Sequence, residues 1–517
     1  MKTNKFTGFT ANRTTLLITA AISAVVAFFF YSCRANYVFL DIAVFSGIAW
    51  LLLSFIIVNT LVLLLLFVAY SYNIRIKGKP LKEYGLLKIL SAICFVATIF
   101  FAIGVTVNIA VAGEETAPVI MKMAERDFLP FISVSAVAFF IAVFPAVDNK
   151  KMRLAIVSLT SICLLIISLY TLAPVTVYKL TSDPLVIDCG DDTYSVVFAT
   201  NTEGTGYVEY EYEGETIRLY DEVTGRISSD SKIHTVKVPK VHLDGNSYRV
   251  GSTRVIEAYS YGSYTGKEVV SREYSFDAPS GTNQQWLCVS DWHTRLDLAY
   301  DAINHAGEYD GVILLGDAAP GLMFEDEIKD YIVEFGGALC NGEKPVVFIR
   351  GNHETRGEYA AKLPGYLGMD SFYYTAAFGD YNFIVLDSGE DKPDDHPEYG
   401  GMVNYEQYRK EMVAWLESLP ANDNKTIAFS HAHVICIEDD LCKRAYDALK
   451  NKGVNYLISG HYHTCDFFDN NDITVYLDGG HNNGVFVASK LSLSSEGILF
   501  QAWDNNGKKI FDKMSSF

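Results

Sequence analysis

The first 180 residues contain five long segments without a single charged residue. These segments are residues 14–33, 42–74, 89–113, 128–147 and 154–178. A helix needs about 20 mainly apolar residues to cross the hydrocarbon core of a bilayer, so each segment is long enough for one span. The second segment has 33 residues. Two spans would need about 40, so we interpret it as one long, tilted helix. The sequence therefore predicts an α-helical membrane domain of five spans over residues 1–180.

The charge of the chain changes sign after this segment. Residues 1–180 contain 15 Lys and Arg against 7 Asp and Glu, whereas residues 181–517 contain 27 against 54. Half of all residues are hydrophobic and the mean hydropathy is +0.15, which excludes a disordered or collagen-like chain and a purely soluble enzyme. The acidic second part argues against nucleic acid as a partner, because phosphate backbones are bound by clustered Lys and Arg.

Basic residues gather on every second connection between the predicted spans. They are Lys2, Lys5, Arg13, Arg75, Lys77, Lys79, Lys82, Lys88, Lys150, Lys151 and Arg153. Because Lys and Arg concentrate in cytoplasmic loops, five spans put the N-terminus in the cytoplasm and residues 181–517 outside the cytoplasmic membrane. A cleaved signal peptide or a lipoprotein site at Cys33 fits less well, since the aromatic residues Phe30 and Tyr31 precede it. We interpret the spans as an anchor, and a sensing role stays open.

Six of the nine cysteines lie in the predicted outer part. They are Cys189, Cys288, Cys340, Cys436, Cys442 and Cys465. In an oxidising compartment such cysteines could pair. Cys436 and Cys442 are the best candidate for a bridge, whereas Cys288 lies in an apolar run and is interpreted as a free core thiol.

Residues 181–280 show a period of two, as in Tyr207–Tyr212, where aromatic or aliphatic and acidic residues alternate. Seven such short runs, separated by turns rich in Gly, Asn, Asp and Ser, predict an all-β sandwich. The segments Leu243–Val250 and Tyr274–Pro279 resemble the fibronectin type III-like domain that precedes the catalytic domain of purple acid phosphatases.

The histidines have an uneven distribution along the chain. None of the 11 precedes residue 234, and eight lie between His293 and His463. Apolar runs predict buried strands at residues 286–290, 311–315, 345–349, 426–429 and 456–458. The polar residues that follow these runs are Asp291, His293, Asp317, Asn352, His353, Glu354, His431, His433, His461 and His463. Because α/β folds collect ligands at the carboxyl ends of their strands, we expect these side chains to meet at one edge.

Helical spacing over residues 328–339 and 406–419 alternates with the predicted strands. Such alternation is typical of sheets flanked by helices. The prediction for residues 281–517 is therefore an α/β domain with α-β-β-α layers. The chain as a whole is therefore predicted to be multidomain, with an N-terminal membrane domain over residues 1–180 and a β-sandwich over residues 181–280 before the α/β domain.

In order and spacing, the strand-end residues resemble the calcineurin-like metallophosphoesterases over roughly residues 286–485. The resemblance implies two divalent metal ions, each of which has its own set of ligands. The ligands of one ion are Asp291, His293 and His463, those of the other are Asn352, His431 and His461, and Asp317 bridges both. Sites of this nitrogen and oxygen chemistry accept Mn, Fe, Zn or Co.

The resemblance also implies the roles of two further residues. A hydroxide between the two ions would attack phosphorus in line, and His353 would donate a proton to the leaving oxygen or stabilise the transition state. Glu354 orients the imidazole of His353. Four residues are candidate contacts for the phosphate or the leaving group: His433, Arg350, Arg356 and His481.

Two departures argue against the ferric-tyrosinate centre of purple acid phosphatases. His293 stands where those enzymes have Gly, and Ala318, Ala319 and Pro320 follow Asp317 where they carry the iron-binding Tyr.

The sequence thus predicts a membrane-anchored, metal-dependent phosphoric ester hydrolase that acts outside the cytoplasmic membrane. Its substrate could be a phosphorylated small molecule, a nucleotide or an envelope phosphate, as a monoester or a diester. The alternative is a membrane sensor or scaffold whose metal domain binds a phosphorylated ligand without turnover. A transporter would need polar residues that face each other across the spans, and the sequence does not indicate them.

Overall fold

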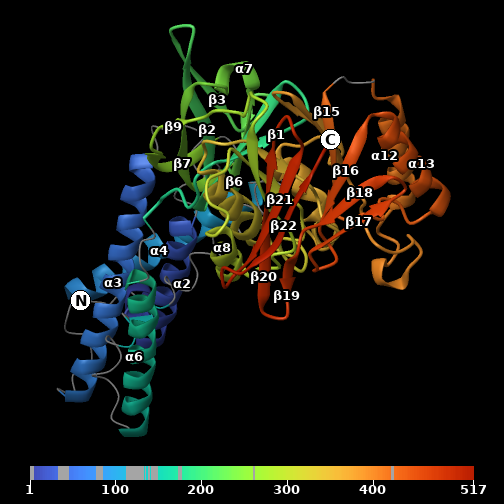
Figure 1. Ribbon diagram of the computed structural model, residues 1–517. Coiled ribbons are helices and arrows are strands. Elements are labelled where there is room, and N and C mark those ends of the chain that lie inside the picture. The colour runs from blue at the N-terminus through green and yellow to red at the C-terminus, as the bar shows by residue number, and fades with distance from the viewer. Residues whose placement is uncertain are drawn as a thin grey trace. The chain divides into compact units, whose positions relative to one another are not determined.

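The computed structural model describes residues 5–32, 46–76, 85–111, 150–172, 177–259, 262–420 and 424–517, and the single positions 133, 136, 137 and 140 (Figure 1). The predicted span at residues 128–147 lies almost entirely outside the described residues. The chain divides into two compact units. The first comprises residues 1–176 and 259–263, and the second comprises residues 177–258 and 264–517.

The described part of the first unit is helical. Its helices are α1 (Lys5–Thr10), α2 (Arg13–Ser32), α3 (Ser46–Ile76), α4 (Gly85–Val111) and α6 (Lys150–Leu172). Among the described residues, one segment, Ser54–Tyr72 of α3, is long and apolar enough to cross a membrane by length and composition. Shorter apolar segments lie in α2, α4 and α6. The helices coincide with four predicted spans, and the five-span arrangement stays a prediction.

Polar side chains meet where α2, α3 and α4 pack together. The side-chain amide of Asn59 donates hydrogen bonds to the hydroxyls of Ser23 (3.2 Å) and Thr98 (2.9 Å). The sequence did not indicate such facing polar residues, because a helical period alone does not tell which neighbour a side chain meets. All three groups are uncharged and satisfied, which is typical of polar contacts that fix helix packing.

The second unit contains two large sheets. The first has the strand order β22–β21–β20–β10–β11–β12–β1–β2–β7–β8. Its C-terminal half is built from β10 (Gln284–Val289), β11 (Gly311–Leu314), β12 (Val346–Phe348), β19 (Gly480–Asn482), β20 (Val485–Leu493), β21 (Ile498–Asp504) and β22 (Lys509–Ser515). β10, β11 and β12 are parallel. The predicted strands at residues 286–290, 311–315 and 345–349 are confirmed to within two residues.

The second sheet has the order β13–β14–β15–β16–β18–β17. Its strands are β13 (Tyr374–Phe378), β14 (Tyr381–Leu386), β15 (Lys425–Ser430), β16 (Val454–Ser459), β17 (Asp466–Asn470) and β18 (Ile473–Leu477). The two sheets pack face to face, since the ring centroid of Trp286 in β10 lies 5.0 Å from that of Phe383 in β14. Burial of this apolar interface is the main force that holds the sheets together.

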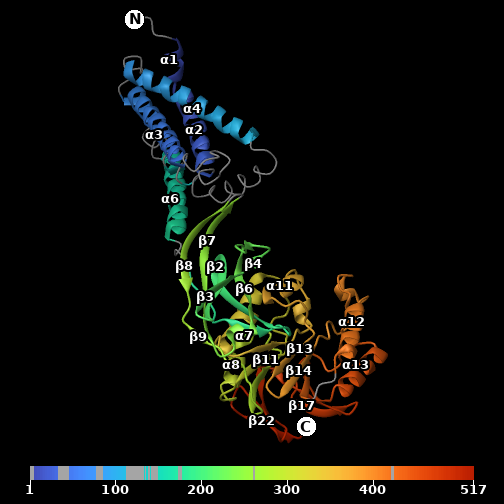
Figure 2. The same cartoon turned by 90° about the horizontal axis from the view of Figure 1, so that it is seen from above.

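Helices cover the outer faces of both sheets. They are α8 (Leu296–Ile303), α9 (Glu325–Ile328), α10 (Phe335–Cys340), α11 (Leu363–Leu367), α12 (Tyr405–Ser418) and α13 (Asp439–Asn451). α12 and α13 lie together on the second sheet, where Met412 and Leu449 pack against Leu457 of β16 (Figures 1 and 2). The predicted α/β alternation is therefore present over residues 281–517.

The segment of residues 181–280 is rich in strands. They are β1 (Leu185–Asp188), β2 (Thr193–Tyr212), β3 (Glu215–Tyr220), β4 (Glu222–Val223), β5 (Arg226–Ile227), β6 (Ser231–Pro239), β7 (Ser247–Tyr259), β8 (Gly262–Val270) and β9 (Tyr274–Ser275), with the short helix α7 (Lys240–Leu243). Figure 2 shows the long strand β2 beside β6 and β7, with which it pairs. Tyr194 and Phe198 from its first half share one buried cluster with Val208 and Tyr210 from its second half.

This β-rich segment is joined to the α/β domain by backbone hydrogen bonds. β1 is antiparallel to β2 and also parallel to β12, with Ile187 opposite Val346. Leu185 and Ile187 belong to the core cluster of the α/β domain. One continuous sheet therefore crosses the boundary expected near residue 280, and the likeness to a fibronectin type III domain stays a prediction.

Candidate metal centre

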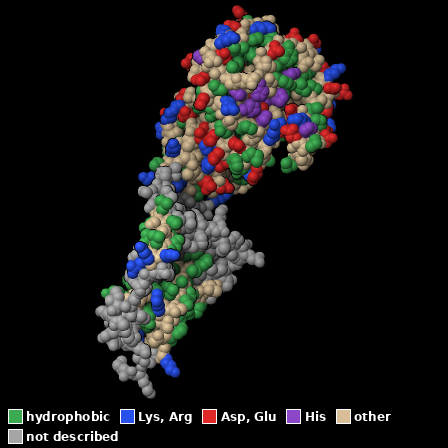
Figure 3. Space-filling view, turned by 90° about the horizontal axis from the view of Figure 1, so that it is seen from below, with side chains coloured by type: hydrophobic (Ala, Val, Ile, Leu, Met, Phe, Trp, Pro, Cys, Tyr) green, Lys and Arg blue, Asp and Glu red, His purple; other side chains and the backbone are tan. Residues whose placement is uncertain are grey.

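The side chains expected at the strand ends meet in one place. Asp291 and His293 follow β10, Asp317 follows β11, Asn352 follows β12, His431 follows β15, and His461 and His463 follow β16. Their ligand atoms form three overlapping groups, within each of which all atoms lie within 4.8 Å of one another. The groups are Asp291, His293 and His463; His293, Asp317 and His353; and Asp317, His431 and His461. Figure 3 shows histidines gathered in one patch on the surface.

Asp291 is the centre of the first group. Its Oδ1 lies 3.9 Å from Nε2 of His293 and 3.5 Å from Nε2 of His463. Nδ1 of His463 lies 2.5 Å from the carbonyl oxygen of His481 and donates its proton there. This bond fixes the tautomer and leaves the Nε2 lone pair toward Asp291, as a metal ligand requires.

Asp317 joins the other two groups. Its Oδ2 lies 3.2 Å from Nε2 of His431 and 3.8 Å from Nε2 of both His293 and His353. Nδ1 of His431 donates to the carbonyl oxygen of Leu315 at 2.6 Å, so its Nε2 also faces the site. A single carboxylate oxygen is therefore surrounded by three imidazole nitrogens.

Asn352 reaches the site through His461. Its Oδ1 accepts a hydrogen bond from Nδ1 of His461 at 3.0 Å. The amide oxygen has a second lone pair that remains able to bind a cation.

Two buried atoms of the centre indicate what it is built to hold. Oδ1 of Asp291 is buried without a hydrogen-bond partner, and the buried Nε2 of His431 faces Oδ2 of Asp317 at 3.2 Å. Buried polar atoms are rarely left without a partner, because desolvation is costly. Carboxylate oxygens and imidazole nitrogens are ligands for Mn, Fe, Zn and Co, so the residues present fit divalent metal ions.

Two histidines of the centre are in the protonation state that metal binding requires, and a third carries a proton. Burial lowers the pKa of His293 and of His461 to about 4, so both imidazoles are neutral at pH 7. Burial opposes charge on His431, but the carboxylate of Asp317 raises the pKa of this histidine to about 10. Burial likewise opposes charge on Asp317, yet the pKa of this carboxyl lies below its usual range because of His431. The proton on His431 therefore occupies the position that a metal ion would take, and metal binding would displace this proton.

The backbone of the centre is strained at several of these positions. Asp291, His293, Asp317, His461 and His463 all have positive φ angles, of 50°, 38°, 61°, 70° and 52°. Such angles are uncommon for residues other than glycine, and they cluster at functional sites where the surrounding structure enforces them. The strained turns allow successive polar side chains to point into one site.

Glu354 has a different role from the one expected. Its carboxylate accepts hydrogen bonds from the backbone N–H groups of Asp317 (2.8 Å), Ala318 (2.6 Å) and Gly351 (2.8 Å), rather than from the imidazole of His353. Glu354 therefore fixes the turns after β11 and β12 against each other. A Cβ atom at position 351 would lie 2.2 Å from Oδ1 of Asp317, so only glycine fits in this contact.

The imidazole of His353 is oriented by the backbone. Nδ1 of His353 lies 2.9 Å from the carbonyl oxygen of Pro320 and donates to it. Its Nε2 faces Asp317 at 3.8 Å and lies 3.5 Å from Nη1 of Arg356. The sequence did not indicate Pro320 as the orienting group, because a backbone carbonyl leaves no residue-type signal.

Both arginines expected to contact phosphate are held by carboxylates. Nη2 of the buried Arg350 lies 2.5 Å from Oδ2 of Asp387, and its guanidinium stacks 4.6 Å from the ring centroid of Phe372. Arg356 forms a bidentate pair with Glu390, at 2.9 and 2.8 Å. Their charges are therefore largely neutralised within the protein, which argues against a direct phosphate contact by Arg350.

The two remaining candidate contacts support neighbouring residues. The His433 ring packs between Tyr462 (4.6 Å) and Phe468 (5.2 Å). His481 holds His463 through its carbonyl oxygen, and its Nε2 accepts a hydrogen bond from the backbone N–H of Gly484 at 3.3 Å.

The candidate bridge between Cys436 and Cys442 does not form, because both residues are free cysteines. Cys436 is buried in the core beneath α12 and α13, where it acts as a small apolar side chain. Cys288 is free and buried, as expected.

Comparison with known proteins places part of this fold in a family. Residues 286–465 match the family model of calcineurin-like phosphoesterases. The comparison with curated proteins found no match. Among solved structures, the chain is similar to GAP50, the anchor in the inner membrane complex of Plasmodium, with 14% identity and a TM-score of 0.35 over 46% of this chain and 89% of that one.

Two further structures show comparable similarity. One is a conserved protein of Streptococcus pneumoniae described as a predicted phosphoesterase, with 11% identity, a TM-score of 0.24 and coverage of 46% of this chain and 98% of that one. The other is a metallophosphoesterase from Sphaerobacter thermophilus, with 12% identity, a TM-score of 0.22 and coverage of 46% and 89%. The assignment rests on the family model and not on these scores. Residues 286–465 of this chain form a calcineurin-like phosphoesterase domain.

Proposed function

We propose that this protein is a membrane-anchored phosphoesterase that uses two divalent metal ions to hydrolyse phosphate esters outside the cytoplasmic membrane. One observation carries the catalytic part of this proposal: Oδ2 of Asp317 lies within 3.8 Å of Nε2 of His431, His293 and His353. In this arrangement the carboxylate of Asp317 lies between the two proposed sets of metal ligands. It also lies beside His353, which belongs to neither set.

The residues that would hold the ions follow from the three groups. Asp291, His293 and His463 would bind one ion, Asn352, His431 and His461 would bind the other, and Asp317 would contact both. Such ions, when bound, lower the pKa of water and neutralise negative charge on phosphate oxygens. The ligand chemistry suits Mn, Fe, Zn or Co equally.

We assign His353 the role of proton donor to the leaving oxygen. Because Nδ1 of His353 is engaged by Pro320, the imidazole can only present Nε2 to the centre. Nη1 of Arg356, which is held by Glu390, lies 3.5 Å from the same Nε2 and can only donate to it, so Nε2 must take up a proton in place of this contact before His353 can act as a donor. A donor fixed in this way avoids reorientation during the reaction.

His353→Ala is expected to lower kcat for an alkyl phosphate about a hundredfold. The loss for p-nitrophenyl phosphate should be several-fold smaller, because a nitrophenolate leaves without protonation. Steady-state rates of the full-length chain with both esters test this, with His305→Ala at an exposed histidine as the matched control. Equal losses for the two esters would contradict a role in leaving-group protonation.

The proposed function itself is tested by ester hydrolysis. The full-length chain, purified in detergent and loaded with Mn, Zn or Fe, is incubated with p-nitrophenyl phosphate and bis-p-nitrophenyl phosphate. We expect metal-dependent turnover of at least one of them. The ratio of the two hydrolysis rates shows whether the enzyme prefers monoesters or diesters. Stoichiometric metal binding with no turnover of any phosphate ester would favour the sensor or scaffold alternative instead.

The membrane part of the proposal is supported by the helical unit. Large apolar side chains are exposed on all five described helices of this unit, among them Leu65 (67%), Phe100 (71%) and Leu154 (68%). In water such side chains would be unfavourable, whereas lipid solvates them. The excess of Lys and Arg on alternate connections favours a cytoplasmic N-terminus.

A protease-protection experiment tests this orientation. The chain should resist extraction from membranes at alkaline pH, and a tag after Phe517 should be removed by protease added to intact spheroplasts. Protection of this tag, with cleavage of an N-terminal tag, would overturn the proposed orientation.

A further inference from the structure

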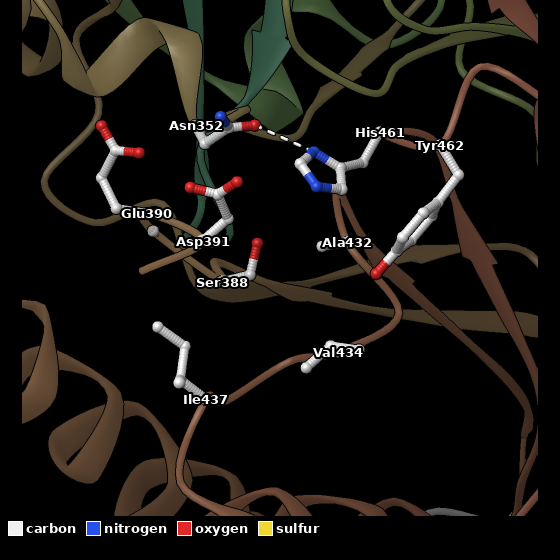
Figure 4. A pocket seen from close by; sticks show the side chains of 10 residues that line it. Asn352, Ser388, Glu390, Asp391, Ala432, Val434, Ile437, His461 and Tyr462 are labelled. Carbon is white, nitrogen blue, oxygen red and sulfur yellow. Dashed lines mark hydrogen bonds between the residues drawn. The ribbon is translucent and has the colours of Figure 1, made fainter. Parts of the chain in front are cut away.

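A pocket of about 250 Å³ opens beside the metal centre. Asn352 and His461 line it on the side of the centre, and the loops after β14 and β15, together with Tyr462 after β16, form the rest. Figure 4 shows Asn352 and His461 on one side and Val434 and Ile437 on the opposite side, with Asp391 and Tyr462 between them. A phosphate group held at the centre would therefore have this space next to it for the remainder of an ester.

One wall of the pocket is apolar. It consists of Ala432, Val434, Ile437 and the ring of Tyr462. Val434 is 46% exposed and Tyr462 is 38% exposed, so both side chains are partly open to solvent. The Tyr462 ring is held in place by His461 (4.9 Å, edge to face) and by His433 (4.6 Å). An apolar wall at a polar site offers contact area to an apolar group of a ligand.

The charged residues of the pocket disfavour an anionic group. Among the described residues that line it, Glu390 and Asp391 are acidic, and none is Lys or Arg. The nearby cations are engaged with these carboxylates, since Arg356 forms the bidentate pair with Glu390 and Lys392 lies 3.1 Å from Asp391. The pocket thus has no free cation for a second phosphate or a carboxylate of the substrate.

We infer that this pocket binds the alcohol part of the substrate and selects an uncharged, largely apolar alcohol over an anionic one. This inference rests on the proposed phosphoesterase function and narrows its substrate class. A cavity of about 150 Å³ is known to hold benzene, so the larger volume here accommodates an aryl or a short branched alkyl group. Val434 and Ile437 determine this specificity by contact, and the lack of a free cation withholds a partner from an anionic group.

A matched pair of esters tests the inference. Phenyl phosphate and 4-carboxyphenyl phosphate differ only in one carboxylate, and their leaving groups have similar reactivity. For the metal-loaded full-length chain we expect kcat/KM to favour phenyl phosphate by about tenfold or more. Val434→Lys should lower this preference about tenfold, because it adds a cation to the apolar wall at an exposed position. Val241→Lys makes the same change at an exposed valine of α7 and should leave the preference unaltered.

Three outcomes would overturn the inference: equal kcat/KM for the two esters, a preference unchanged in Val434→Lys, or an equal shift in Val241→Lys. If neither ester is hydrolysed, the proposed function fails separately. Calorimetric binding of phenylphosphonate and 4-carboxyphenylphosphonate to the metal-loaded chain then decides the specificity. Tighter binding of phenylphosphonate, lost in Val434→Lys, supports the inference, and equal or absent binding overturns it.

Discussion

Asp317→Asn should reduce ester hydrolysis by about a thousandfold or more, because it removes the negative charge on which the metal centre converges. Oδ2 of Asp317 faces the Nε2 atoms of His431, His293 and His353. The substitution keeps the size of the side chain, but an amide cannot bridge two cations, and its N–H₂ group has no lone pair for an ion. The expected loss corresponds to several kcal/mol of transition-state stabilisation.

Two measurements on the same preparation test this prediction. Metal content per chain, determined by mass spectrometry, should fall together with kcat/KM for p-nitrophenyl phosphate. Asp297→Asn, at an exposed position in the first turn of α8, should change neither quantity. Full metal occupancy and full activity in Asp317→Asn would show that the bridging position has been assigned to the wrong residue.

Glu354→Ala is expected to give a large loss of stability. Three backbone N–H groups, those of Asp317, Ala318 and Gly351, donate to the buried carboxylate of Glu354. Alanine would leave all three without a partner, and each buried donor left unpaired costs about 1–3 kcal/mol. The free energy of unfolding should therefore fall by about 3 kcal/mol or more. The strained turn at Asp317 should also relax, so metal affinity should fall as well.

Chemical unfolding of the full-length chain, followed by tryptophan fluorescence, measures this loss. Glu354→Gln should be intermediate, because the amide oxygen still accepts hydrogen bonds whereas the amide nitrogen does not. Glu358→Ala changes an exposed glutamate of the same loop and should be within about 0.5 kcal/mol of the unchanged chain. A loss in Glu354→Ala as small as that in Glu358→Ala would refute the role of Glu354 in joining the two turns.

The strand ends of the domain could be predicted from sequence because their pattern is local. An apolar run such as Trp286–Val289 predicts a buried strand, and the polar residues directly after it lie at the carboxyl edge of the sheet. Because five predicted strands end in polar residues, Asp291, Asp317 and His431 could be predicted to lie close together although the paths of the connecting loops were not known.

Other parts of the site depend on contacts that sequence alone does not reveal. Glu354 was expected to orient His353, but its partners are backbone groups, which have no sequence signature. Arg350 looked available for phosphate because its partner Asp387 comes from a different strand end. The pocket wall at Val434 and Ile437 belongs to a loop without period, so its shape follows only from the packing around it.

The pairing of β1 with β12 has a consequence for any attempt to isolate the catalytic domain. A fragment that begins near residue 281 would lack β1, so β12 would become an edge strand with unpaired N–H and C=O groups. It would also lose Leu185 and Ile187 from the core, which would uncover apolar surface beside this edge. Exposed edges next to apolar surface recruit strands from other molecules. Such a fragment should aggregate, whereas one that begins before Leu185 keeps its own strand in that place.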